Sequence, residues 1–247
     1  LPEFRNLSQA NKFTFTESNA QRLEDVKTDL SIAKKKTLHL REKVTDLIID
    51  SFKEIGYKVE FRTLNAADYG VAQKRERVIF VGTRLDIPII FPEPTHLSRK
   101  NGKQLEFPTV TVKHHITVRE TIDDLKGKPE DAGWSHIFAK HKPEFVEKIH
   151  NTPIGQSIYG GYSDAWFRNP PDEPSRTVKE NHGGVMVHYE KDRVMTPREL
   201  ARLQSFPDDF MFRGSKSKVL VQIGNAVPPL LGKAIGKAVK EMLRCGR

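Results

Sequence analysis

The chain contains a single cysteine, Cys245, close to its last residue, and this limits the ways in which a fold can be held together. One thiol cannot form an internal disulfide, and it cannot supply a cysteine-based zinc site or an iron–sulfur cluster. The fold must therefore depend on a hydrophobic core, and the 247 residues, 37% of them hydrophobic, provide enough apolar surface for one. The lack of disulfides also indicates a reducing compartment, the cytoplasm.

Basic residues are concentrated in the last third of the sequence. The formal net charge is +9, from 41 basic and 32 acidic residues. Residues 1–84 contain 16 basic and 12 acidic side chains, residues 85–175 contain 11 and 13, and residues 176–247 contain 14 and 7. Such a surplus suits an anionic partner such as nucleic acid, and a merely solvated basic surface is the alternative interpretation. No apolar run approaches the eighteen residues of a membrane-spanning helix, so no membrane partner is expected.

Residues 40–84 predict one helix followed by two strands. Apolar residues recur every three or four positions from Leu40 to Ile55, which is typical of an amphipathic helix, and Gly56 predicts its end. Residues 57–64 alternate between apolar and polar side chains, and residues 77–83 have the pattern of a buried strand. The loop between the two strands, residues 65–76, is too long for a tight hairpin and is a candidate for function.

Residues 5–36, which precede the first helix, form a polar lead-in that is predicted to be irregular or partly helical. Further helices are predicted after residue 84. A capping box at Thr117 and Glu120 opens a short helix over residues 117–125. The remaining predicted helices cover residues 143–149, residues 196–207 with Pro at the first helical position, and the segment that begins near Pro228.

Two arginines stand two residues apart at the entry to the second strand, in the sequence QKRER of residues 73–77. Alternate residues of a strand share a face, so Arg75 and Arg77 are expected to point the same way. Paired guanidinium groups suit a phosphate or a nucleobase carbonyl. The alternative is a pair of solvated charges on an edge strand, matched by Glu76 or Asp68.

Three blocks, in the same order, resemble motifs of the cytosine-5 DNA methyltransferase family. They are residues 68–77 (DYGVAQKRER), residues 196–210 (TPRELARLQSFPDDF) and residues 222–229 (QIGNAVPP). The resemblance covers about residues 40–84 and 174–243. The segment between them corresponds to the variable domain of the family.

The resemblance implies an α/β fold in three parts. Residues 1–84 would be the C-terminal part of the catalytic domain, with its polar lead-in, and would contribute to a partial doubly wound, Rossmann-like sheet of an S-adenosylmethionine-dependent methyltransferase. Residues 85–195 would form a small, irregular α+β target recognition domain. Residues 196–247 would return to the catalytic domain with the final helix.

The activity that the resemblance implies is methyl transfer from S-adenosylmethionine to carbon five of a cytosine in a specific double-stranded DNA sequence, as in restriction–modification systems. The base must be flipped out, because its ring carbons cannot be reached inside a stacked duplex. Arg77 would hydrogen-bond the cytosine carbonyl, and Arg75 would organise the same catalytic pocket. Gln73 would be structural.

The same resemblance assigns cofactor-binding and DNA-reading residues. Phe206 would pack against S-adenosylmethionine, with an ordinary core aromatic as the alternative, and Asn225 and Val227 would line the far side of that pocket. DNA would be read by two loops, residues 160–168 and 176–184, whose candidate residues are Tyr162, Arg168, Lys179, His182, Gly183 and Gly184. The alternative for His182 is an ordinary surface histidine. Arg198 and Glu199 would be mainly structural, with Glu199 as a cap and Arg198 bracing the last motif.

Three elements that the family needs are missing from these 247 residues: a glycine-containing cofactor loop, a Pro-Cys nucleophile and a Glu-Asn-Val segment. Cys245 lies beyond the last motif and does not occupy the place of the nucleophile. The chain is therefore expected to be inactive alone, either as one polypeptide of a split methyltransferase with a complementary chain or as a part of a single-chain enzyme. Without that complement it should expose a sheet edge and an apolar face and be poorly soluble. The alternative function is a non-catalytic DNA-binding or regulatory paralogue.

Overall fold

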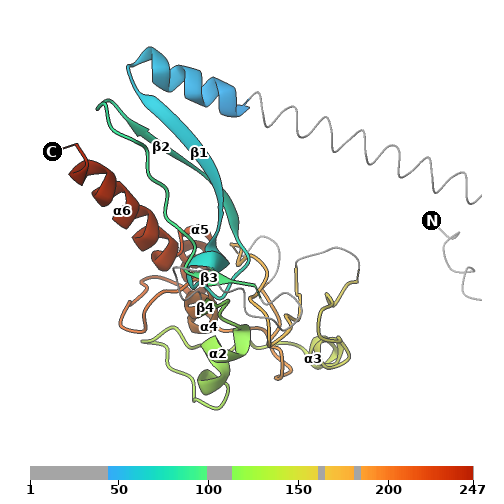
Figure 1. Ribbon diagram of the computed structural model, residues 1–247. Coiled ribbons are helices and arrows are strands. Elements are labelled where there is room, and N and C mark those ends of the chain that lie inside the picture. Colours follow the sequence, from blue (N-terminus) through green and yellow to red (C-terminus); the bar gives the residue numbers. More distant parts are fainter. Residues whose placement is uncertain (1–43, 99–112, 161–164, 181–184, 247) are drawn as a thin grey trace, which may run out of the picture. The chain divides into compact units, whose positions relative to one another are not determined.

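The computed structural model describes residues 44–98, 113–160, 165–180 and 185–246 (Figure 1). They form a mixed α/β structure that divides into two compact units, one up to Val59 and one from Glu60 onward. The predicted lead-in of residues 5–36 and the expected DNA-reading residues Tyr162, His182, Gly183 and Gly184 lie outside the described residues. No helix in the described parts is long and apolar enough to cross a membrane.

The first unit contains a helix over residues 44–54. Gly56 ends it with a positive φ of 83°, and the Gly56 N–H donates to the Lys53 carbonyl at 2.9 Å, so the predicted stop is confirmed. The Phe52 ring lies edge-on to Tyr57, 5.8 Å away. Much of the predicted apolar stripe is nevertheless solvent-exposed, including Leu47 at 67% and Ile55 at 63%.

Strands β1 (Lys58–Asn65) and β2 (Glu76–Thr83) pair as a two-stranded sheet and run in opposite directions (Figure 1). Both strands agree with the sequence-based prediction. One face of this hairpin packs against the long helix α6 (Pro229–Arg244), where Leu64 shares a cluster with Leu231 and Val81 shares a cluster with Met242.

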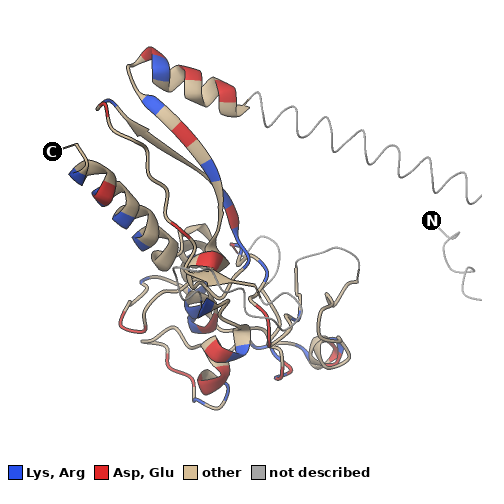
Figure 2. Ribbon diagram, viewed as in Figure 1, with Lys and Arg blue, Asp and Glu red and all other residues tan. Residues whose placement is uncertain are grey.

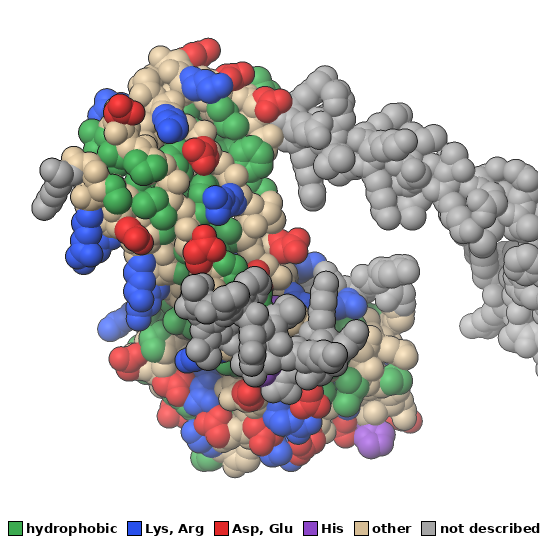
Figure 3. Space-filling model, viewed as in Figure 1, with side chains coloured by type: hydrophobic (Ala, Val, Ile, Leu, Met, Phe, Trp, Pro, Cys, Tyr) green, Lys and Arg blue, Asp and Glu red, His purple; other side chains and the backbone are tan. Residues whose placement is uncertain are grey.

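The opposite face of the hairpin is apolar and largely open. Phe61 of β1 and Phe80 of β2 contact each other with ring centroids 5.5 Å apart. Phe61 is 41% exposed and Val78, which alternation puts on the same side as Phe80, is 47% exposed. Hydrophobic side chains accordingly appear among charged ones over the part of the surface that holds β1 and β2 (Figure 3).

The long loop between the strands is an ordered turn built around Asn65. Its side-chain oxygen accepts hydrogen bonds from the N–H groups of Ala67 and Arg75, both at 3.2 Å, so one residue ties together the two ends of the loop. Between them lies the 3-10 helix η1 (Ala66–Tyr69). Gly70 ends η1 in the left-handed region, where a residue with a side chain is strained, and a Cβ atom there would lie 2.8 Å from the His96 ring and would have to displace it.

The middle of the chain contains short elements: β3 (His96–Leu97) and β4 (Lys113–His114), which pair in parallel, α2 (Val118–Ile122), η2 (Asp123–Leu125) and α3 (Pro143–His150). The predicted capping box is present, because the Thr117 N–H donates to Glu120 Oε2 at 2.8 Å and the Glu120 N–H donates to Thr117 Oγ1 at 3.2 Å. Short strands were expected in this irregular α+β segment, but two-residue strands have no sequence signature from which their positions could be predicted.

Helices α4 (Pro197–Leu203) and α5 (Lys216–Asn225) complete the structure with α6. The α4 prediction is correct at its start, but the helix ends at Leu203, earlier than Pro207 implies. Helix α5 was not predicted at all. Its start is marked by the Ser215 side chain, which accepts from the Lys218 N–H. The largest hydrophobic cluster lies among α2, α4 and α5, with Ile122, Leu203 and Ile223 fully buried.

Candidate functional site

Four segments that are far apart in the sequence meet beside the entry to β2. They are the QKRER block before and at the start of β2, the segment of residues 175–180, the end of α4, and the last turn of α5. All three family-like blocks and the second predicted DNA-reading loop therefore contribute to one place in the fold.

Arg75 is a buried brace at this meeting point. It is 7% exposed, and its guanidinium donates from Nη1 to the Val178 carbonyl at 3.0 Å and from Nη2 to the Gly224 carbonyl at 3.2 Å. Burial, and next the positive charge of Arg77, lower the pKa of Arg75 to about 10, so the group is still cationic at neutral pH. Both terminal nitrogens are used to join two backbone segments.

Arg77 is in a different environment from Arg75. It is exposed on β2, and its Nη1 donates to the Glu76 carbonyl at 2.6 Å. Arg75 and Arg77 were expected to share a face, but Arg75 is buried and Arg77 is exposed. The reason is that β2 begins only at Glu76, so strand alternation does not reach Arg75. Pairing with Asp68 is not observed either, since the Asp68 carboxylate lies 2.8 Å from His115 Nε2. Arg77 is the arginine that a ligand can reach.

The predicted cofactor residues lie where the end of α4 meets the start of α6. The Leu230 N–H donates to Ser205 Oγ at 3.1 Å and joins these two segments. Phe206 is half-buried, packs against the main cluster and has its ring centroid 5.0 Å from that of Phe212, which matches the core-aromatic alternative. Val227 is 62% exposed and free to meet an apolar ring.

Asn225 contacts the segment of residues 175–180. Its Nδ2 donates to Glu180 Oε2 at 3.2 Å, and the residue itself is exposed at the end of α5. An aromatic edge, an exposed valine and an amide would fit one wall of a pocket for S-adenosylmethionine.

The predicted DNA-reading residues have contrasting environments. Lys179 is exposed beside the last turn of α5. Arg168 is 8% exposed, and its Nη2 donates to the Ile149 carbonyl at 2.5 Å and lies 3.3 Å from Asp192 Oδ1. Its guanidinium links three parts of the chain, and this burial counts against direct contact with DNA. The sequence did not predict the burial of Arg168, because an arginine in a loop has the same sequence pattern whether it contacts DNA or braces the fold.

Arg198 corrects another expectation. It is fully buried, and its guanidinium donates to the carbonyls of Trp134 at 2.9 Å, Pro207 at 3.3 Å and Phe210 at 2.9 Å. It therefore braces the turn after α4 rather than the last motif. Glu199 is the cap that was predicted, and it also forms a two-point ion pair with Arg193 at 2.7 and 2.8 Å.

His188 is a fully buried residue that the sequence did not single out. Its Nδ1 accepts from the N–H groups of Glu190 at 3.0 Å and Lys191 at 3.1 Å, so the neutral ring carries its proton on Nε2, which lies 3.8 Å from Glu199 Oε1. Burial lowers the pKa of His188 to about 4, and the Glu199 carboxylate offsets this only in part.

A pH dependence of stability follows from His188. Its pKa in the folded chain is about 4 against an ordinary 6.5, so below pH 6.5 the unfolded chain binds the proton first and stability falls. We expect a loss of about 3 kcal/mol between pH 6.5 and pH 4, from 1.36 kcal/mol per pH unit. Urea unfolding at several pH values measures it. A His188→Gln variant should show a shallower fall over this window, and an equally steep fall would contradict the assignment.

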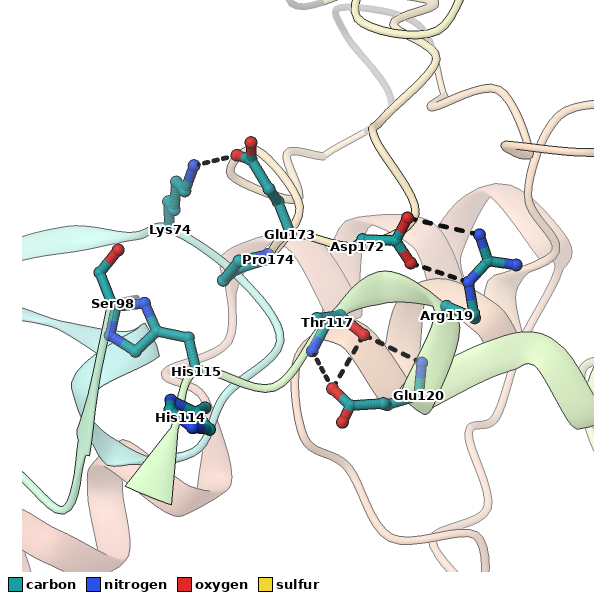
Figure 4. Close-up of a pocket in the computed structure, with 10 residues that line it drawn as sticks. All are labelled: Lys74, Ser98, His114, His115, Thr117, Arg119, Glu120, Asp172, Glu173 and Pro174. Carbon is teal, nitrogen blue, oxygen red and sulfur yellow. Dashed lines mark hydrogen bonds and ion pairs between the residues drawn. The ribbon is translucent and has the colours of Figure 1, made fainter. Parts of the chain in front are cut away.

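A cavity of about 670 Å³ lies beside Lys74 and the start of α2 (Figure 4). Its cations are already paired, Lys74 with Glu173 at 2.6 Å and Arg119 with Asp172 at 2.9 Å. Glu120 adds a third carboxylate to the lining. Since three carboxylates face two cations, the cavity is not suited to a DNA phosphate. The lining residues are Lys74, Ser98, His114, His115, Thr117, Arg119, Glu120, Asp172, Glu173 and Pro174.

The basic surplus of the last third lies partly on α6. This helix carries Lys233, Lys237, Lys240 and Arg244 against the single acidic residue Glu241, and basic residues outnumber acidic ones along it in Figure 2. Helix α6 is therefore more attractive to an anion than the cavity beside α2.

Comparison with known proteins agrees with this arrangement. A model of the C-5 cytosine-specific DNA methylase family matches residues 23–241. The chain is 36% identical over 206 residues to the type II methyltransferase M1.HphI of Haemophilus parahaemolyticus, which covers 79% of this chain and 51% of the relative. It is 36% identical over 202 residues to M.BbvI of Brevibacillus brevis, covering 74% of this chain and 49% of the relative. The chain thus spans about half the length of these curated relatives.

A solved structure shares the fold. It belongs to a prophage-encoded Escherichia coli protein assigned as a DNA modification methyltransferase, and the match has a TM-score of 0.58 at 21% identity. The similarity covers 83% of this chain and 65% of the other. The mixed α/β architecture is therefore that of DNA methyltransferases, as the sequence analysis expected.

Proposed function

Because the chain belongs to the C-5 cytosine-specific DNA methylase family, we propose that it is the target-recognising C-terminal part of a DNA (cytosine-5) methyltransferase and is incomplete by itself. The observation that carries this proposal is the brace made by Arg75. It joins the strand that bears exposed Arg77 to the recognition segment at Val178 and to the last motif at Gly224. A group that could contact a base and a segment that could read DNA are thereby held at one place.

In this proposal Arg77 is the residue that touches the flipped-out cytosine. Its guanidinium donates to the ring carbonyl and stabilises negative charge that develops there during methylation. S-adenosylmethionine supplies the methyl group when bound, and Phe206, Asn225 and Val227 would form one wall of its site. Arg75 would hold the pocket together and would not touch the base, because both of its terminal nitrogens already donate to backbone carbonyls.

The complement would supply the Pro-Cys nucleophile, the cofactor loop and the Glu-Asn-Val segment. Two observations support its existence. The chain spans about half the length of M1.HphI, and the β1–β2 hairpin is a two-stranded sheet with exposed Phe61 and Val78 on one face. An isolated two-stranded sheet is only marginally stable, and sheets of doubly wound folds are covered on both faces.

Reconstitution tests the proposal. The chain is mixed with a complementary chain, or with the N-terminal half of M1.HphI or another similar methyltransferase, and transfer of a labelled methyl group to double-stranded DNA is followed. We expect transfer only when both parts are present. In the cell, the assembled enzyme would act in the cytoplasm, at the nucleoid. Transfer by this chain alone would contradict its incompleteness. Salt-dependent DNA binding with no transfer in any mixture would favour the second function, a non-catalytic DNA-binding paralogue.

A further inference from the structure

The segment of residues 175–180, called the stem below, lies along the QKRER block like a short extra strand. The Ser175 N–H donates to the Ala72 carbonyl at 3.0 Å, and the Lys74 N–H donates to the Ser175 carbonyl at 2.8 Å. Thr177 Oγ1 adds a bond to the Lys74 carbonyl at 2.9 Å. The stem is therefore fixed to the same residues that lead into the arginine strand.

Two fully buried glutamines extend this attachment into the core. Gln73 Oε1 accepts from the Val178 N–H at 2.7 Å, and Gln73 Nε2 donates to Gln204 Oε1 at 2.8 Å. Gln204 Nε2 in turn donates to the Ile223 carbonyl at 2.6 Å. Both side chains are 0% exposed. The result is a continuous relay from the stem through the end of α4 to α5, in which the side-chain amide oxygen and nitrogen of both glutamines each have a partner.

The far side of the stem is held as well. Arg75 binds the Val178 carbonyl, so both backbone polar groups of Val178 are fixed by side chains of the QKRER block. A Cβ atom on Gly224 would lie 2.2 Å from the Glu180 backbone nitrogen, which shows how closely the last turn of α5 approaches the stem. Exposed Lys179 lies between these two fixed points.

We propose that Gln73 and Gln204 are positioning residues for DNA sequence recognition, which act by fixing the stem and hence the place at which Lys179 meets DNA. This inference rests on the proposed function. Neither glutamine would touch DNA. A buried amide must keep its directional partners, because a buried amide without a partner bears the free-energy cost of desolvation with no hydrogen bond to offset it. The relay therefore permits one register of the stem, where apolar packing alone would permit several.

A purely structural role makes a different prediction from a positioning role. If the relay only stabilises the core, its loss lowers the unfolding free energy and leaves the choice of DNA sequence unchanged. If it positions the stem, its loss weakens discrimination between sequences while non-specific, salt-dependent binding to phosphates is kept.

The experiment compares four variants of the full chain, alone and with its complement. Gln204→Met and Gln73→Met break the relay. Thr177→Val is a milder change that removes only the outer stem bond, and it keeps the test decisive if a methionine variant fails to fold. Gln222→Met is the matched control, because Gln222 is an exposed glutamine of α5 that also donates to a carbonyl, that of Arg213 at 2.9 Å.

Two measurements are made on each variant. Hydrogen exchange follows the backbone amides of the stem, with α6 as the internal reference. Selection from a pool of randomised duplexes, followed by sequencing, gives the ratio of affinities for preferred and singly mismatched sites. We expect the relay variants to speed exchange at Val178 and to reduce this ratio about tenfold, the size of one mismatch. Thr177→Val should do so more weakly, and Gln222→Met should do neither.

The failures can be told apart. A wild-type chain that selects sequences, with relay variants that select them equally well, would overturn the positioning role and leave the proposed function intact. A wild-type chain that selects no sequence with or without its complement would overturn the proposed function, and the positioning role with it.

Discussion

The reconstituted enzyme with Arg77→Ala is expected to transfer methyl groups about 10² to 10³ times more slowly than the wild type, the range found when one donor to a developing charge is removed. Arg77 is exposed on β2, and its one described hydrogen bond goes to the Glu76 carbonyl at 2.6 Å. Its side chain does not contribute to the hydrophobic core, so its removal should not destabilise the fold. The effect should therefore appear in the rate of transfer and not in folding.

The measurement is single-turnover methyl transfer at saturating DNA, with circular dichroism as the check on folding. Arg84→Ala is the matched control, because Arg84 is an exposed arginine that follows directly after β2. Arg77→Lys should fall between alanine and wild type, because a lysine keeps the charge but loses the planar donor fork. Full activity of Arg77→Ala would remove Arg77 from the proposed reaction.

Two glycine-to-alanine changes in neighbouring helices are expected to have opposite signs. In Gly224→Ala the new methyl group would lie 2.2 Å from the Glu180 nitrogen and 2.4 Å from the Lys179 carbonyl carbon. These are backbone atoms, so the stem must move, and overpacking of this kind costs roughly 1–3 kcal/mol or more. The carbonyl of Gly224 would also shift away from Arg75, which weakens the brace.

Gly236→Ala is the control. A Cβ atom at Gly236 in α6 meets nothing within 4 Å, so alanine should stabilise that helix by about 0.5–1 kcal/mol. Urea unfolding midpoints compare the two variants. If Gly224→Ala were as stable as the wild type, the close approach of α5 to the stem would be wrong, together with the argument that the stem is tightly held.

Local signals in the sequence were sufficient wherever neighbouring residues decide the outcome. The capping box at Thr117, the cap formed by Glu199, the glycine end of the first helix and the two strands of the hairpin were all predicted, because each depends on residues a few positions apart. Helix α5 was missed because Ser215 is the only signal at its start and its last four residues belong to the block of residues 222–229 that resembles a family motif.

The roles of the arginines needed the tertiary structure. Arg75, Arg77, Arg168 and Arg198 look alike in sequence, yet Arg77 is exposed while the other three are buried against backbone carbonyls. Each of those carbonyls belongs to a residue at least nine positions away, for example Val178 for Arg75. No local pattern encodes such a partner.

The position of the single cysteine agrees with the sequence analysis. Cys245 lies at the end of α6, is exposed and forms no disulfide. The three ordered blocks indicated the family, and the missing nucleophile led to the expectation of incompleteness, because covalent chemistry depends on which residues are present. Only the tertiary structure decided that Gln73, Arg75, Gln204 and Gly224 converge on residues 175–180, because buried hydrogen bonds and close packing join residues that are up to 149 positions apart in the chain.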